Sequence, residues 1–172
     1  MNQIWFTDIT YVKTVRDGWT YLASVIDMHS RRIIGYAYGF HKDTTLALMA
    51  LSNALLSRDI RPDETILHSD NGPEFTSIDY EVVAEAYKLR RSYSAPGVPY
   101  DQAVIESFHA TLKKEEVHPN VYESFEEARV RLIYWIEHWY NRTRFHSSLD
   151  YLSPVEFEKE LAVKKVPTVQ KT

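Results

Sequence analysis

The sequence predicts an α/β domain in which helices flank a mixed, five-stranded sheet. Three observations lead to this fold class. Three consecutive segments near the start are rich in aromatic and β-branched residues, strand-like and helix-like segments then alternate, and the last third is helical. Consecutive strands commonly pair as an antiparallel meander, whereas strands reached through a helical crossover run parallel. We therefore expect three antiparallel strands, followed by strands that run parallel to the first.

The predicted strands have the composition that sheets favour. They lie at residues 3–12, 19–29, 32–40, 64–69 and 90–94. The polar turn Ser30-Arg31 should join the second and third strands into a hairpin. The fourth strand stops at Asp70-Asn71-Gly72-Pro73, which is a strong turn signal.

The predicted helices lie at residues 44–57, 77–88, 101–116 and 124–140, and after Ser153-Pro154. The first is apolar nearly all round, as in a buried helix. Helical spacing places Phe125, Ala128, Leu132, Ile136 and Trp139 on one core-facing side. Ser153 can cap the last helix, with Pro154 in its first turn. We expect one domain over residues 1–160 and a flexible C-terminal tail over residues 161–172.

Composition limits the possible chemistry. The chain has 172 residues, 44% of them hydrophobic and 26% charged, which suits one globular domain. It has no cysteine, so a metal site must use carboxylates, histidines or carbonyls. It lacks a signal peptide and an apolar run of about 18 residues, so we expect a cytoplasmic protein without a membrane partner. The net charge of −4 argues mildly against nucleic acid as a partner.

Three acids stand where they could meet. Asp8 interrupts the first strand, and Asp70 ends the fourth, where ligands bind in such sheets. These two strands can lie side by side. Glu106 should point off the apolar face of its helix, on the same stripe as His109 and Lys113.

A cluster of three carboxylates implies a cation. At a separation of about 4 Å, each pair would repel by about 4 kcal/mol at an effective dielectric constant of about 20. Oxygen ligands select Mg²⁺ or Mn²⁺, and two such ions can support phosphodiester cleavage or transfer. Spacing alone leaves a structural alternative open, in which Asp8 caps a bulge, Asp70 forms an Asx-turn and Glu106 lies on a helix surface.

Longer motifs point to a family. WFTDIT, HSDNGPEFTS and SYSAPGVPYDQAVIESFHATLKKE resemble bacterial insertion-sequence transposases with an integrase catalytic core. The resemblance is greatest to the second-frame product of two-frame insertion sequences. The 35 residues between Asp70 and Glu106 match the Asp-Asp-35-Glu signature of the retroviral-integrase-like superfamily. With WTYLASVIDMHSRRIIGY and YWIEHWYNRTRFHSSLDYLSP, the similarity covers about residues 4–157.

This resemblance implies an RNase H-like fold and a metal-dependent DNA transposase. Asp8, Asp70 and Glu106 would be the catalytic residues and would hold two Mg²⁺ (or Mn²⁺) ions, while water or a DNA 3′-OH attacks a phosphodiester. Lys113 would contact DNA near the reacting phosphate. The implied partners are transposon-end and target DNA and further copies of the chain, at least a dimer when DNA ends are synapsed. The implied location is the bacterial cytoplasm, in association with the nucleoid.

Other residues are weaker candidates. Tyr93 and Ser94, in a loop before the catalytic helix, could contact DNA, with tyrosine stacking on a base. Arg142 and Arg144 could contact phosphates. His68, Asn71 and His109 could support the metal ligands. For His68 a packed neutral histidine is the favoured interpretation, whereas Asn71 could equally be a turn residue.

The chain departs from the family in two ways. Gln102 replaces the asparagine that usually follows the aspartate in this motif, a change of one amide for another. Relatives carry a helix-turn-helix region before the core, whereas this chain starts almost at Asp8, which suggests an excised domain or a truncated gene product. Two alternative functions follow: a plain RNase H-like nuclease, or a truncated, non-catalytic DNA-binding remnant.

Overall fold

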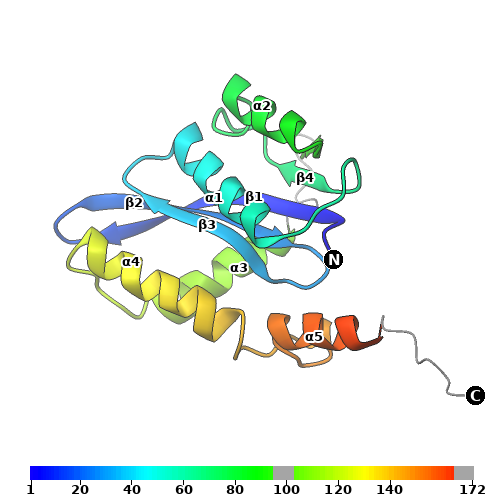
Figure 1. Ribbon diagram of the computed structural model, residues 1–172. Coiled ribbons are helices and arrows are strands. Elements are labelled where there is room, and N and C mark those ends of the chain that lie inside the picture. Colours follow the sequence, from blue (N-terminus) through cyan, green and yellow to red (C-terminus); the bar gives the residue numbers. More distant parts are fainter. Residues whose placement is uncertain (95–102, 165–172) are drawn as a thin grey trace, which may run out of the picture.

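A mixed five-stranded sheet forms the middle layer, with helices on both faces (Figure 1). The computed structural model describes residues 1–94 and 103–164. The strand order is β3-β2-β1-β4-β5. The bounds of the strands are β1 Ile4–Thr14, β2 Gly18–Asp27, β3 Ile33–Gly39, β4 Ile66–Ser69 and β5 Arg90–Tyr93.

The pairing confirms the predicted topology. β1, β2 and β3 form an antiparallel meander. β4 runs parallel to β1, and β5 runs parallel to β4. Along β1, alternate side chains enter two separate cores, with Trp5 and Ile9 in one and Phe6 and Val12 in the other. Side chains of the central strand β1 are therefore buried on both faces of the sheet.

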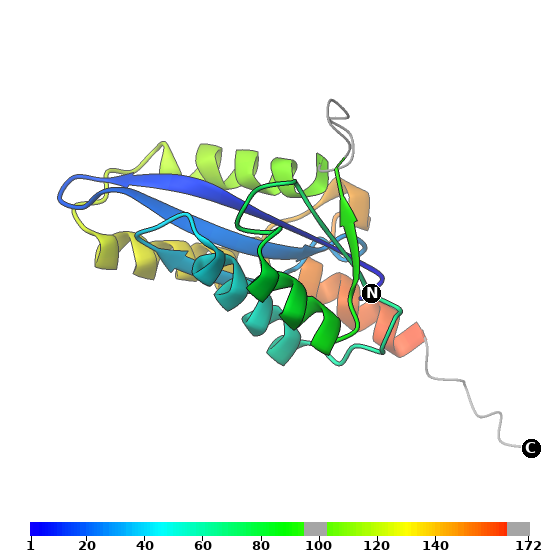
Figure 2. The same ribbon diagram turned by 90° about the horizontal axis from the view of Figure 1, so that it is seen from above.

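Helices α1 (Thr44–Ser57) and α2 (Ile78–Ala86) cover one face of the sheet (Figure 2). Side chains cap both helices: Asp43 accepts a hydrogen bond from the N–H of Leu46 at 2.9 Å, and Ser77 accepts one from that of Tyr80. Gly35 on β3 lets α1 approach closely, because a Cβ there would lie 2.4 Å from the carbonyl oxygen of Ala50.

Helices α3 (Ala103–Leu112) and α4 (Phe125–Tyr134) cover the opposite face, and α5 (Pro154–Lys164) follows at one end (Figure 1). Ser153 and Glu156 form the predicted cap of α5, with the Glu156 N–H 3.4 Å from Ser153 Oγ and the Ser153 N–H 3.0 Å from Glu156 Oε2. Because α5 continues to Lys164, the predicted tail boundary at residue 161 lies inside this helix. The predicted helical residues 101–102 and the tail beyond residue 164 lie outside the described residues.

Two π-helical turns, Lys113–Val117 and Trp135–Tyr140, end α3 and α4. A π turn holds more residues than an α turn, so it shifts which side chains face the sheet. The prediction that Trp139 faces the core is therefore wrong. Trp135 and Tyr140 are buried, whereas Trp139 is 45% exposed and its indole N–H donates to Glu115 at 3.0 Å.

None of the helices in the described part of the chain is long and apolar enough to cross a bilayer.

Candidate active site

Asp8 on β1 and Asp70, the first residue after β4, occupy matching positions along two neighbouring parallel strands. Phe6 of β1 pairs with His68 of β4, and each aspartate lies two residues further along its strand direction. Strand alternation directs both carboxylates to the face that α3 covers, where the Phe6 and His68 rings lie 5.3 Å apart between centroids. β4 ends at Ser69 while β1 continues, so the carboxylates flank the point where the two strands part.

Backbone amides hold one oxygen of each aspartate. The Ile9 N–H donates to Asp8 Oδ1 at 2.7 Å, and the Gly72 N–H donates to Asp70 Oδ1 at 2.9 Å. The second contact, in the Asp70-Asn71-Gly72 turn, is the Asx-turn that the structural alternative expected of Asp70. Both side chains are therefore held in fixed orientations before any ligand binds.

Helix α3 lies across from the two aspartates. Ile105, Phe108 and Leu112 anchor it in the core. Nδ1 of His109 lies 3.3 Å from Asp8 Oδ2, so this face of α3 is next to the β1 carboxylate. Glu106 is exposed and stands one turn before His109 on the same side of the helix, off the apolar face as predicted.

The carboxylates fit a divalent cation by their chemistry. Asp8, Asp70 and Glu106 offer only oxygen donors and none is buried, which suits Mg²⁺ or Mn²⁺. Within residues 1–94 and 103–164, however, no three acidic or histidine side chains lie close enough to bind one ion together. The fold brings Asp8 and Asp70 together and places Glu106 on the facing helix, without closing the three into one group.

A lysine and a buried glutamate lie beside the aspartates, and sequence reasoning did not identify them. Nζ of Lys42 is 2.9 Å from Oε1 of Glu74, which is 4% exposed. The contact with Glu74 raises the pKa of Lys42, and the charges of Asp70 and Asp8 act in the same direction. A Cβ at Gly72 would lie 2.9 Å from both Asp70 Oδ1 and Glu74 Oε1. In the sequence, only Gly72, which lies between Asp70 and Glu74, could have indicated that these two acids lie close together. Lys42 is far from both in the sequence, so no sequence pattern indicated its contact with Glu74.

His68, Asn71 and Ser94 join the ends of β4 and β5. The His68 ring lies between two serines, 3.0 Å from Ser92 Oγ and 3.0 Å from Ser94 Oγ. The Asn71 amide donates to the Ser94 carbonyl at 3.2 Å. His68 is therefore a packed, hydrogen-bonded histidine next to the site, and Asn71 supports the turn that carries Asp70.

The candidate DNA-contacting residues are spread over several surfaces. The Tyr93 hydroxyl donates to Glu81, so its ring faces α2. Lys113 Nζ donates to the Tyr11 carbonyl and lies 3.7 Å from the centre of the Tyr11 ring, three residues along β1 from Asp8. Burial lowers the pKa of Lys113. Arg142 is exposed, whereas Arg144 pairs with Glu115 at 3.0 Å and lines a cavity.

Comparison with known protein families gives two matches to models of the integrase core domain, over residues 1–99 and 87–154. The chain is 43% identical over 159 residues to transposase InsF for insertion sequence IS3A of Escherichia coli K12, covering 92% of this chain and 54% of that protein. The chain thus spans about half the length of the curated relatives it matches.

Solved structures show the same fold. The catalytic core domain of BIV integrase has a TM-score of 0.68 and 20% identity, covering 97% of this chain and all of that one. The HTLV-2 integrase catalytic core domain, solved in complex with magnesium in a trimeric form, has a TM-score of 0.65 and 16% identity, covering 91% of this chain and 95% of that one. The predicted RNase H-like fold is confirmed.

Proposed function

The chain belongs to the integrase core domain family, and we propose that it catalyses metal-dependent DNA strand cleavage and 3′-OH strand transfer in transposition. The observation that carries this proposal is the position of Asp8 on β1 and of Asp70 directly after the adjacent parallel strand β4, with Glu106 on the helix that faces them. The three carboxylates come from three separate segments of the chain, and a phosphate-binding cation would give them a common partner.

In this proposal Asp8, Asp70 and Glu106 hold two Mg²⁺ or Mn²⁺ ions. When bound, such ions stabilise negative charge on the attacking and leaving oxygens of an in-line displacement at phosphorus. The protein supplies orientation. The Ile9 and Gly72 amides and His109 fix the aspartate carboxylates, so little reorganisation is needed as charge develops.

Two lysines add positive charge near the site. Lys42 lies beside Asp8 and Asp70, and Lys113 lies on the β1 edge past Asp8. In our proposal Lys113 exchanges its carbonyl contact for a DNA phosphate near the reacting bond. Tyr93 and Ser94 would contribute to DNA binding at the end of β5, and Arg142 from the turn after α4.

The proposed partners are transposon-end and target DNA, together with further copies of this chain. Synapsis of two DNA ends requires at least a dimer, and the HTLV-2 integrase core has been solved in a trimeric and a dimeric form. We place this activity in the bacterial cytoplasm, at the nucleoid, with no membrane partner.

The first experiment measures ion binding. Isothermal titration calorimetry with Mn²⁺ should show binding by the wild-type chain and its loss in Asp70→Asn. Asp59→Asn, the same chemical change at an exposed acid after α1, should bind as the wild type does. Absence of ion binding by the wild type, or equal binding by Asp70→Asn, would leave a non-catalytic DNA-binding remnant as the better description.

The second experiment separates transfer from hydrolysis. A labelled DNA duplex with a free 3′-OH is incubated with a plasmid target and Mn²⁺, and cut and joined products are resolved on a gel. Joined product that disappears in Glu106→Gln agrees with the proposal. Cut product without joined product would instead identify a plain RNase H-like nuclease.

A further inference from the structure

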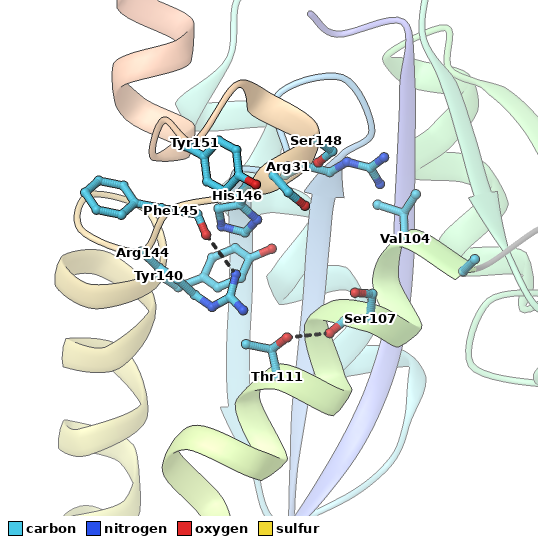
Figure 3. A pocket seen from close by; sticks show the side chains of 12 residues that line it. Arg31, Val104, Ser107, Thr111, Tyr140, Arg144, Phe145, His146, Ser148 and Tyr151 are labelled. Atoms are coloured by element: carbon cyan, nitrogen blue, oxygen red, sulfur yellow. Dashed lines mark hydrogen bonds between the residues drawn. The ribbon is translucent and has the colours of Figure 1, made fainter.

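A polar cavity lies on another flank of α3 from the three carboxylates. It has a volume of about 550 Å³ and lies between α3 and the segment that follows α4, with the β2–β3 turn at its side (Figure 3). Glu106 and Ser107 are neighbours on α3, but only Ser107 lines this cavity. Successive helix residues point about 100° apart, so the cavity and the carboxylates lie on different flanks of the same helix.

Two arginines give the cavity positive charge. Arg31 enters from the β2–β3 turn and Arg144 from the segment after α4 (Figure 3). Nε of Arg144 is paired with Glu115, which neutralises part of its charge. Within the described residues, the Arg31 guanidinium has no ion pair and no hydrogen bond. The cavity therefore contains one uncompensated cation.

The backbone fixes Arg31 in place. Its φ angle is +59°, in the left-handed region that residues other than glycine rarely adopt. The Arg31 N–H donates to the Asp27 carbonyl at 2.8 Å, and the buried Asp27 carboxylate accepts the N–H groups of His29 and Ser30. These hydrogen bonds hold the β2–β3 turn, and with it the Arg31 backbone, in one conformation beside the cavity.

Aromatic side chains stand exposed at the edge of the cavity. Phe145 is 67% exposed and Tyr151 is 72% exposed. Tyr151 also has a positive φ, of +60°, and its N–H donates to the His146 carbonyl at 3.0 Å. An ordered loop thus presents two large rings to solvent beside a cation. Proteins that bind single strands combine these elements, with basic groups on the backbone and rings on the bases.

From this arrangement we infer that the cavity binds a backbone phosphate of a DNA strand, with Arg31 as its main charged contact and Phe145 or Tyr151 against a base. The hydroxyl groups of Ser107 and Ser148 are further donors at the same surface. The phosphate bound here is not the one that reacts, because α3 separates it from the carboxylates. The inference rests on the proposed function only in taking DNA as the substrate.

The test measures DNA binding without metal. In EDTA, fluorescence anisotropy gives the affinity of the chain for a short, labelled single-stranded oligonucleotide over a range of salt concentrations. Arg31→Gln should weaken binding several-fold and lower the slope of log K against log[salt] by about 0.7, the value for one phosphate contact. Arg16→Gln makes the same charge change on an exposed arginine at the opposite end of β2, and should alter neither quantity.

Cross-linking identifies the site directly. An oligonucleotide that carries 5-iodouracil should cross-link to Phe145 or Tyr151, and Arg31→Gln should reduce the yield. Excess inorganic phosphate should compete weakly, because it offers nothing for the rings to contact. Full displacement of the oligonucleotide by inorganic phosphate at equal concentration would show a free-phosphate site and overturn the inference.

Other outcomes also contradict it. Equal binding by wild type and Arg31→Gln, or equal losses in Arg31→Gln and Arg16→Gln, would exclude a specific contact. A change in sedimentation of the free chain with unchanged DNA binding would identify a protein interface instead. Because these measurements need neither metal nor turnover, weakened binding without any cleavage by the wild type would contradict the proposed function and leave this inference standing.

Discussion

Nζ of Lys42 lies 2.9 Å from Oε1 of Glu74, and this ion pair joins the start of α1 to the turn that carries Asp70. The two side chains differ in exposure, at 46% for Lys42 and 3% for Glu74. A buried carboxylate needs a partner, because it has lost most of its hydration. Lys42 therefore maintains the charge balance of Glu74 beside the proposed ion site.

Lys42→Met should destabilise the fold by about 1–3 kcal/mol, since it leaves Glu74 buried and unpaired. The double variant Lys42→Met/Glu74→Gln should recover part of this loss, because the uncompensated charge is gone. Urea denaturation of the two single variants and the double variant measures the coupling. Additive losses would mean that the ion pair contributes nothing to stability.

Gly35→Ala should destabilise the fold by at least about 1–3 kcal/mol, because overpacking of the core forces backbone shifts. The added Cβ would lie 2.4 Å from both the Ala50 carbonyl oxygen and the Ala54 nitrogen, so α1 must move away from β3. Gly39→Ala is the matched control, since its Cβ would meet only the flexible Leu46 side chain, at 3.0 Å. Equal midpoints of thermal unfolding for the two variants would contradict this account.

Asn141→Ala should cost about 2–4 kcal/mol, because it leaves buried backbone groups without partners. Asn141 is 1% exposed, and its amide both accepts from the Ile33 N–H and donates to the Ile33 carbonyl at 3.0 Å. These bonds attach the segment after α4 to the outer strand β3. Asn53→Ala removes one exposed bond to the Tyr36 carbonyl and should cost far less in the same denaturation experiment.

The free energy of unfolding should decrease as the pH is lowered from about 6.5 to about 4, because of His146. Burial lowers its pKa to about 4, and Arg144 and Arg31 act in the same direction. In the unfolded chain an ordinary histidine takes up its proton near pH 6.5. Within this window the unfolded state therefore binds more protons, and the folded state becomes less stable as pH falls. The loss should be about 1–2 kcal/mol, less than the full shift would give, because His146 is only partly buried and solvent screens its charge.

The check is urea denaturation at both ends of this window. His146→Gln should show a smaller loss of stability than the wild type on acidification, whereas His118→Gln, at an exposed histidine, should match the wild type. Identical pH dependence in His146→Gln and the wild type would show that His146 does not cause the effect.

Local sequence patterns predicted most of the fold. The aromatic and β-branched composition of residues 3–12 predicted the first strand, which is buried on both faces, and the apolar run over residues 44–57 predicted α1 at its observed bounds. The prediction that the first and fourth strands are adjacent placed Asp8 beside Asp70, because parallel pairing continues the same register. Spacing alone did not assign a role to Glu106, and the family resemblance supplied that hypothesis.

The sequence by itself determined the elements and their order, because these depend on residues that are near one another in the chain. Tertiary structure decided which distant side chains meet. Trp139 turned outward because a π-helical turn changed the helix periodicity, and Lys42 paired with Glu74 because α1 begins beside the Asp70 turn. Arg31 and Arg144 share a cavity only because the segment after α4 packs against the β2–β3 turn. Such contacts are set by packing between elements, which no local pattern records.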